Sequence, residues 1–250
     1  MRLIAPNLSA AHAFTTRQGG VSQAPYDSLN LGLSTGDRSE NVLENRRRAL
    51  ALIGGELERV ALLHQVHSAR VVVAEAGLRD RQGDGLLTGE SGIPLAVSGA
   101  DCYPVLVEDP RQGCVGAAHA GWRGVAAGIG GALVEAFRDC FGSRAEDLRV
   151  AIGPGISGRN YQVGDDVVAR LSRAGLPLDS CCTPEDQVSG REWKWRLDLV
   201  AALAWQLERA GVDPGRVWAA GRCTYGEPAE FFSHRRDGAR TGRQWGMIVG

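Results

Sequence analysis

Residues 93–123 read IPLAVSGADCYPVLVEDPRQGCVGAAHAGWR, and the rest of the chain is organised around this stretch. It contains three short apolar runs, Pro94 to Val97, Val105 to Val107 and Cys114 to Ala118. Glycine and proline bound these runs, which is typical of buried strands. Cys102 lies in the turn between the first two runs, and the third leads to His119. Functional side chains are often mounted at strand ends and turns, so both residues are candidates for chemistry.

A further candidate lies upstream, where residues 62–67 read LLHQVH. If this run is extended, period-two alternation places Gln65 and His67 on one face and His64 on the other. Together with the two residues of the central stretch, His67 completes a candidate set of two imidazoles and one thiolate. His64 lies off that face, and we expect it to be a packed or hydrogen-bonded histidine.

The flanking sequence alternates between helical and strand patterns, with glycine turns between them. Nothing in it marks a domain boundary. The pattern predicts helices at 39–53, 125–142, 163–175 and 195–211, strands at 150–152, 217–220 and 247–249, an ordered loop at 12–38, and an irregular connection at 177–194.

Composition limits the classes of function. The chain has 28 basic and 29 acidic residues, so it lacks the electrostatic footprint of a protein that binds nucleic acid polymers. Its apolar runs are far shorter than the roughly 20 residues of a membrane helix. Six scattered cysteines and no Arg/Lys-led apolar leader favour the reducing cytoplasm. Lys194 is the only lysine and no Gly-Lys-Ser/Thr loop occurs, so anion recognition must fall to arginine and backbone N–H groups.

The motifs of this chain resemble the successive blocks of the YfiH-type, laccase-domain family. The blocks are TTRQGGVSQAPYDSLNLG, the Asn45-Arg46 pair, HQVHSARV, GDGLLT, ADCYPVLVEDP, AAHAGWRGVAAGI, AIGPGISGRNYQVG, and CTY with FFSHRRDGARTGRQWGMI. They cover nearly the whole chain in the family's order. Members of this family were once called polyphenol oxidases and are now assigned as purine nucleoside phosphorylases with adenosine deaminase side activity.

The resemblance implies one α+β domain over residues 1–250, with mixed β-sheets flanked by α-helices. It also implies a catalytic metal site on His67, Cys102 and His119, because these residues match the family's ligand motif. Ser68 stands where glycine is frequent, which leaves the local backbone shape open. Three ligands of this type suit a zinc ion that keeps its fourth position for water or substrate. Such a site activates water, which suits attack on C6 of adenosine with release of ammonia.

Phosphorolysis makes different demands on the same pocket. Phosphate must attack the anomeric carbon while the base departs, so the site needs cationic groups for phosphate and a proton donor or Lewis acid for the purine. We therefore expect purine nucleosides and phosphate as partners. The family blocks offer Arg17, Arg46, Arg123 and Arg235 as the cations, each of which also suits a structural or solvated role, and Gln65 or Asp101 as groups that orient water or base.

Three alternatives stay open. Copper also suits a set of two histidines and a cysteine, but five histidines in the whole chain cannot furnish the centres of a four-copper polyphenol oxidase. Without metal, Cys102 as nucleophile and His119 as base would give a hydrolase or amidase. The third alternative is a binding or metal-buffering protein in which the three residues are simply packed. His67 separates the first two chemistries, because a dyad does not need it.

Overall fold

The computed structural model describes residues 2–185 and 194–250, and the strands within these ranges form three sheets. The largest has six strands, β3 (Val71–Val73), β4 (Gly85–Thr88), β6 (Tyr103–Asp109), β7 (Cys114–Ala120), β8 (Arg149–Ile152) and β12 (Val217–Ala219). Their order is β12-β8-β6-β7-β4-β3. The outermost pairs at both edges are parallel and the central pairs are antiparallel, so this sheet is mixed.

A second, four-stranded sheet packs against the first. Its strands are β1 (Arg2–Leu3), β2 (Ala11–Thr15), β5 (Leu95–Gly99) and β13 (Gln244–Val249), in the antiparallel order β1-β2-β13-β5. The facing sides of the two sheets share an apolar cluster that includes Phe14, Leu95, Val97, Leu106 and Ala117. The third sheet is small, with order β10-β11-β9 for the strands β9 (Gln162–Val163), β10 (Cys182–Pro184) and β11 (Trp195–Leu197).

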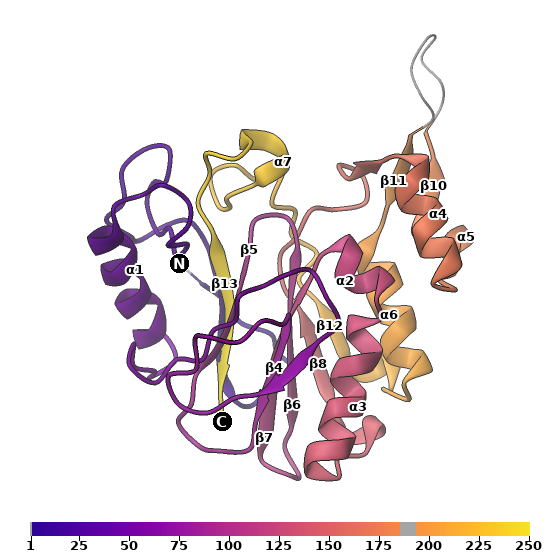
Figure 1. Cartoon of the computed structure of the whole chain (residues 1–250), viewed down its shortest axis with the longest axis horizontal. Coiled ribbons are helices and arrows are strands. Elements are labelled where there is room, and N and C mark those ends of the chain that lie inside the picture. The colour runs from indigo at the N-terminus through magenta and orange to yellow at the C-terminus, as the bar shows by residue number, and fades with distance from the viewer. Residues whose placement is uncertain (1, 186–193) are drawn as a thin grey trace.

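Helices cover the two outer faces of this pair of sheets (Figure 1). Helix α1 (Ser39–Ala51) packs on the four-stranded sheet, where Leu50 shares an apolar cluster with Trp245 and Met247. The other face of the six-stranded sheet carries α2 (Trp122–Ala126), α3 (Ile129–Phe141) and α6 (Leu199–Arg209). The remaining helices are α4 (Asp165–Arg173), α5 (Leu178–Cys181), α7 (His234–Asp237) and the 3₁₀ turns η1 (Ala145–Asp147) and η2 (Pro214–Arg216).

The predicted fold class is confirmed, since mixed sheets flanked by helices make up the structure. The three runs of the central stretch form β5, β6 and β7. The helix expected at 39–53 is α1, and of its three consecutive arginines Arg47 and Arg48 are exposed while Arg46 is buried. Within the described ranges, no helix is long and apolar enough to cross a membrane.

Two predicted helices have different boundaries in the structure. Residues 195–197 of the helix expected at 195–211 are strand β11. The helix starts only after Asp198, whose carboxylate accepts hydrogen bonds from the N–H groups of Val200 and Ala201 at 2.9 and 3.1 Å and so caps it. The helix expected at 125–142 is divided, because Gly128 has a left-handed φ of 89° that ends α2 before α3 begins.

Three expected loops and runs also differ. The loop at 12–38 begins as strand, because β2 includes residues 12–15. The run 62–67 is not a strand, and its strand-like pairing is limited to the isolated bridge of His64 with Gln82. The connection at 177–194 contains α5 and β10 in its described part, and residues 186–193 lie outside the described residues.

Candidate metal centre

His67, Cys102 and His119 converge in space, and we call them the trio. Their potential ligand atoms all lie within 4.8 Å of one another, and Cys102 Sγ is 4.0 Å from His67 Nε2. The two imidazole rings meet edge to face, with 4.8 Å between their centroids. His119 is buried, Cys102 is half-buried and His67 is exposed, so the cluster opens toward solvent on one side. Two nitrogens and one sulfur at this spacing fit a metal ion that keeps one position open.

Strand pairing brings two members of the trio together from different parts of the chain. Cys102 lies in the turn between β5 and β6, immediately before the first residue of β6. Strands β6 and β7 are antiparallel with Pro104 opposite His119. The register of this pair therefore places His119, near the end of β7, beside the turn that carries Cys102.

Gly121 leaves the space in which the trio meets. A Cβ atom at this position would lie 2.8 Å from Cys102 Sγ and 3.0 Å from His67 Cδ2. The first distance is shorter than side-chain carbons tolerate, so any larger residue would displace the thiol or the imidazole. The glycine at the start of α2 is therefore part of the site.

The carboxylate of Asp84 orients both histidines of the trio. Its Oδ1 lies 2.9 Å from His119 Nδ1 and accepts the backbone N–H of His67 at 3.0 Å. Its Oδ2 accepts the backbone N–H of Ser68 at 2.6 Å and the Ser68 hydroxyl at 2.8 Å. Because a carboxylate only accepts, Nδ1 of His119 carries the proton and Nε2 is the nitrogen left for a metal.

Electrostatics couple these three ionisable groups. Burial alone would raise the pKa of the Cys102 thiol, but the charge and hydrogen bonds of His119 and His67 lower it to about 6. Burial would lower the pKa of His119, but Cys102 and Asp84 raise it to about 9. Burial would raise the pKa of Asp84, and its bonds with His119 and Ser68 instead lower it to about 2. Without metal, the neutral-pH site is therefore a thiolate beside an imidazolium, next to a carboxylate.

Backbone conformation also marks this region. Among the described residues, His67 with φ 59° and Asp101 with φ 103° are the non-glycine residues in the left-handed region. One belongs to the trio and the other precedes Cys102. Such conformations are costly for residues with a side chain and persist where the surrounding structure enforces them, as at functional sites.

Asp101 and Gln65, predicted to orient water or base, are bonded to nearby segments of the protein. Asp101 accepts the hydroxyl of Thr224 and the backbone N–H of Arg235, both at 2.7 Å. The Gln65 amide donates to the carbonyl of Ser98 and accepts its N–H, both at 2.8 Å. Both side chains therefore hold backbone segments around the trio, and their role toward water or base stays a prediction.

Two of the predicted arginines lie near the trio. Arg235 belongs to α7, donates to the carbonyl of Gln162 at 2.7 Å and lies over the ring of Tyr161, 5.0 Å from its centroid. Arg123 is exposed and lies over the ring of Trp122 at 4.5 Å. Burial raises the pKa of Tyr161, with the charge of Cys102 acting in the same direction and those of Arg235 and Arg123 opposing it. The charges of both arginines and of Cys102 therefore act on the same tyrosine.

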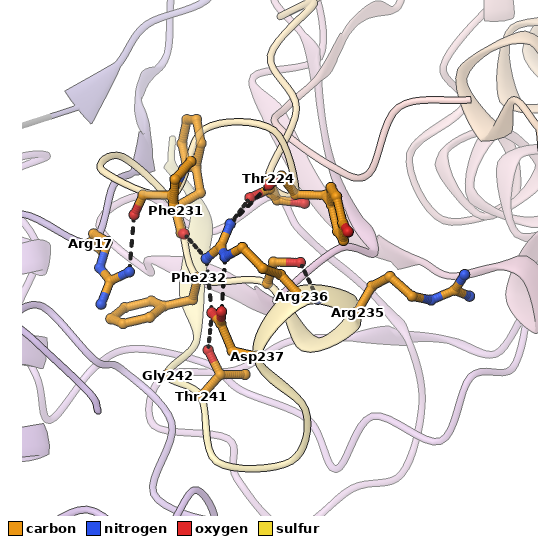
Figure 2. Close-up of polar contacts among 12 residues, drawn as sticks. Arg17, Thr224, Phe231, Phe232, Arg235, Arg236, Asp237, Thr241 and Gly242 are labelled. Atoms are coloured by element: carbon orange, nitrogen blue, oxygen red, sulfur yellow. Dashed lines mark hydrogen bonds and ion pairs between the residues drawn. The ribbon is translucent and has the colours of Figure 1, made fainter. Parts of the chain in front are cut away.

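Arg236, the neighbour of Arg235, has a different environment (Figure 2). Its guanidinium donates to the carbonyls of Thr224 at 2.6 Å, Tyr225 at 3.1 Å and Phe231 at 2.8 Å. It also pairs with Asp237 at 2.8 Å. Figure 2 shows the two neighbouring side chains pointing in opposite directions, so Arg236 holds its own loop together while Arg235 reaches away from it.

The other two predicted arginines have partners within the protein. Arg17 pairs with Asp27 at 3.2 Å and donates to the carbonyl of Pro228 at 3.0 Å. Arg46 is buried, donates to the carbonyl of Leu31 at 2.9 Å and lies over the ring of Trp245 at 4.9 Å. Burial, aided by the charge of Arg79, lowers the pKa of Arg46 to about 10. A role for either in binding substrate stays a prediction.

One expectation concerned His64, and two residues of the site, Asp84 and Gly121, were not predicted from the sequence. His64 lies outside the trio as expected. It is exposed and therefore not packed, and its backbone N–H donates to the carbonyl of Arg81 at 2.9 Å. Asp84 lies in the block GDGLLT, and an acid between two glycines is the one signal that the sequence offers for it. Gly121 gave no sign of its role, because the side chains that require it come from distant parts of the chain.

Comparisons with known proteins place the chain in a family. A family model described as multi-copper polyphenol oxidoreductase laccase matches residues 11–250. The chain is 46% identical over 250 residues to a purine nucleoside phosphorylase of Deinococcus radiodurans, covering 98% of this chain and 91% of that one. It is 40% identical over 256 residues to the purine nucleoside phosphorylase YlmD of Geobacillus stearothermophilus, covering 97% and 91%.

Solved structures give the same result for the fold. The crystal structure of YlmD from Geobacillus stearothermophilus superposes with a TM-score of 0.89 at 39% identity, covering 98% of this chain and 93% of that one. The hypothetical protein YfiH of Bacillus licheniformis superposes with a TM-score of 0.87 at 32% identity, covering 95% and 91%. The chain therefore belongs to the family described as multi-copper polyphenol oxidoreductase laccase, whose relatives at this level of identity include proteins named purine nucleoside phosphorylase.

Proposed function

We propose that this protein is a purine nucleoside phosphorylase that splits adenosine or inosine with phosphate into free base and ribose 1-phosphate. Deamination of adenosine at the same site is the proposed side activity. The observation that carries the proposal is the convergence of the trio, with its Asp84 support, in a chain 46% identical to a protein named for this activity. The scattered thiols suit a cytoplasmic enzyme.

The residues around the trio suit the demands of phosphorolysis. The donor set fits zinc, which when bound by His67, Cys102 and His119 would supply a Lewis acid at the site. Asp84 fixes the proton on Nδ1 of His119 and so keeps that ring in one orientation. Arg123 and Arg235 bring positive charge to the edge of the site, where a phosphate dianion requires it.

The test is chromatographic. Purified protein of known metal content is incubated with adenosine or inosine, with and without phosphate. Phosphate-dependent release of free base together with ribose 1-phosphate is the expected result. Release of free base together with free ribose in either buffer, or no turnover at all, would contradict a phosphorylase. Conversion of adenosine to inosine without phosphate would report the deaminase activity separately.

A metal-free hydrolase or amidase that uses Cys102 and His119 is the second candidate, and the thiolate–imidazolium pair favours it. His67 separates the two candidates, because a dyad does not need a third ligand. For the phosphorylase, His67→Ala and His119→Ala each remove metal retention and activity together. His64→Ala is the matched control and keeps both. Activity of His67→Ala at the wild-type level would favour the dyad.

The same preparations identify the metal. A mononuclear copper site remains the alternative to zinc, because the trio suits both ions. Metal analysis of protein purified without added metal, followed by reconstitution with zinc or copper, would decide between them. Zinc at one ion per chain, with turnover restored by zinc alone, is the expected result. Turnover of phenols by the copper form would support the polyphenol oxidase instead.

A further inference from the structure

We propose that Arg243 binds the phosphate co-substrate beside the trio. The inference rests on the proposed phosphorylase function and names a cation for it that the sequence motifs did not single out. It is carried by the position of Arg243, by the N–H groups of its guanidinium that have no partner in the described residues, and by the packing of its side chain.

Strand register places Arg243 next to the turn that carries Cys102. Arg243 directly precedes β13, in which Gln244 pairs with Gly99 at the end of β5. The chain leaving β5 continues within three residues to Cys102, so the backbone of Arg243 lies beside the start of that turn. On its other side, the backbone of Arg243 is bonded to the loop near Asn30, which accepts its N–H through Oδ1 at 2.9 Å.

The guanidinium of Arg243 is half-buried and has an incomplete set of partners. Its Nη1 donates to the carbonyls of Thr241 at 3.0 Å and Gly242 at 2.8 Å. In residues 2–185 and 194–250, no carboxylate lies within ion-pair distance of it, and its Nε and Nη2 have no hydrogen-bond acceptor. Withdrawing a guanidinium from water without acceptors for its N–H groups is costly, so this environment fits a ligand that supplies anionic oxygens.

Electrostatics agree with a position close to the trio. Burial lowers the pKa of Arg243, and the charges of Cys102 and Asp101 oppose that effect. The hydrogen bonds of Asp101 go to Thr224 and Arg235, so the N–H groups of Arg243 are not used by it.

The side chain is also held in place before any ligand arrives. A Cβ on Gly32 would lie 2.8 Å from Cγ of Arg243, so the stem of Arg243 passes directly over this glycine. A guanidinium with Nε and Nη2 free presents two parallel N–H donors, the geometry that matches two oxygens of one phosphate. Little side-chain entropy then remains to be lost when phosphate binds.

In the reaction, Arg243 would position the nucleophile and would not itself react. A phosphate oxygen donates an electron pair to C1′ of the ribose as the C1′–N9 bond breaks. The electron pair of that bond passes to the purine, which leaves as the free base after taking up the proton that hydrogen phosphate loses when it becomes ribose 1-phosphate. The guanidinium keeps its charge and protons throughout, so its contribution is to hold the phosphate dianion close to C1′.

Steady-state kinetics of Arg243→Gln test the assignment. We expect the KM for phosphate to rise about 10- to 100-fold, the usual worth of a charged hydrogen-bond pair, and the KM for adenosine to stay within about threefold. Arg243→Lys keeps the positive charge but loses the two parallel N–H donors of the guanidinium. Its KM for phosphate should therefore rise less, by about several-fold. Arg240→Gln removes an exposed arginine from the same segment and should leave both constants unchanged.

Calorimetric titration with inorganic phosphate alone separates this inference from the proposed function. Wild-type protein should bind phosphate without nucleoside, and Arg243→Gln should bind it about 10- to 100-fold more weakly. Wild-type phosphate constants in Arg243→Gln would overturn the assignment while leaving the phosphorylase intact. Phosphate binding through Arg243 without phosphorolysis would overturn the function and keep the site. If Arg243→Gln does not fold, Arg243→Lys decides, and unchanged phosphate constants there would overturn the assignment.

Discussion

Oδ1 of the buried Asp84 lies 2.9 Å from Nδ1 of His119. The same carboxylate accepts the N–H groups of His67 and Ser68, so one residue at the start of β4 orients a ring on β7 and the backbone of a loop. Ligand orientation by such an outer carboxylate is a common feature of metal sites. In this fold, the spacing of the trio depends on a residue outside it.

Replacement of Asp84 by Asn should therefore weaken metal binding more than it weakens the fold. The Asn side chain would place an N–H₂ group against the N–H donors of His119, His67 and Ser68, which all point at this carboxylate. We therefore expect the affinity for zinc to fall by about 10- to 100-fold. Competition with a chromophoric chelator measures this affinity. Asp109→Asn is the matched control, because Asp109 is equally buried, ends the same β6 that Cys102 precedes, and accepts the backbone N–H of Arg111. Equal zinc affinity in the two variants would contradict a special role for Asp84.

Gly121→Ala tests the space at the centre of the site. Gly121 has φ −91°, which alanine adopts without strain, so the backbone should accept the change. The added methyl would displace Cys102 Sγ or His67, and we expect metal retention and activity to fall by at least tenfold at nearly unchanged melting temperature. Gly131→Ala, in α3 with nothing within 4 Å of the new atom, should retain full activity and gain up to about 1 kcal/mol.

The sequence was sufficient for the strands around the trio but not for the loop that carries His67. Runs such as Val105 to Val107 are apolar and bounded by Gly or Pro, a local pattern that directly reflects burial in a sheet. His67 instead sits in a left-handed conformation enforced by Asp84, and no local pattern encodes a hydrogen bond across 17 residues. The boundary at Asp198 was missed because a helical pattern of apolar residues continued into β11.

The contacts of the arginines could not be predicted from the sequence either. Arg17 and Arg46 occupy family blocks, but only the tertiary structure shows that they contact Asp27 and Leu31. Arg243 lies in a family block too, and its proximity to Cys102 depends on the pairing of β13 with β5. Adjacency across a sheet cannot be read from sequence spacing, because the partner strands are far apart in the chain.

The neighbours Arg235 and Arg236 should differ in what they contribute. Arg236→Gln removes charged hydrogen bonds to three loop carbonyls, so we expect a loss of about 2 kcal/mol in the free energy of unfolding. That loss corresponds to a melting temperature lower by roughly 4–8 °C for a domain of this size. Arg235→Gln should keep the melting temperature and lower activity with nucleosides. Calorimetry and kinetics on the pair would contradict this division if both variants lost stability equally.

Alkylation of Cys102 should depend on both metal and pH. In metal-free protein, its pKa of about 6 keeps the thiol ionised at neutral pH, so the rate with iodoacetamide should rise to a plateau above pH 6 and fall as the pH drops below it. Zinc should protect the thiol, because the bound sulfur is no longer a free nucleophile.

Two other cysteines serve as controls. Buried Cys114, whose pKa burial raises to about 11, should stay unmodified, while exposed Cys140 should react with or without zinc. Mass spectrometry of peptides reads all three thiols in one sample. A rate at Cys102 that zinc does not change would remove this residue from the ligand set, and a rate still rising at pH 9 would rule out the thiolate–imidazolium pair.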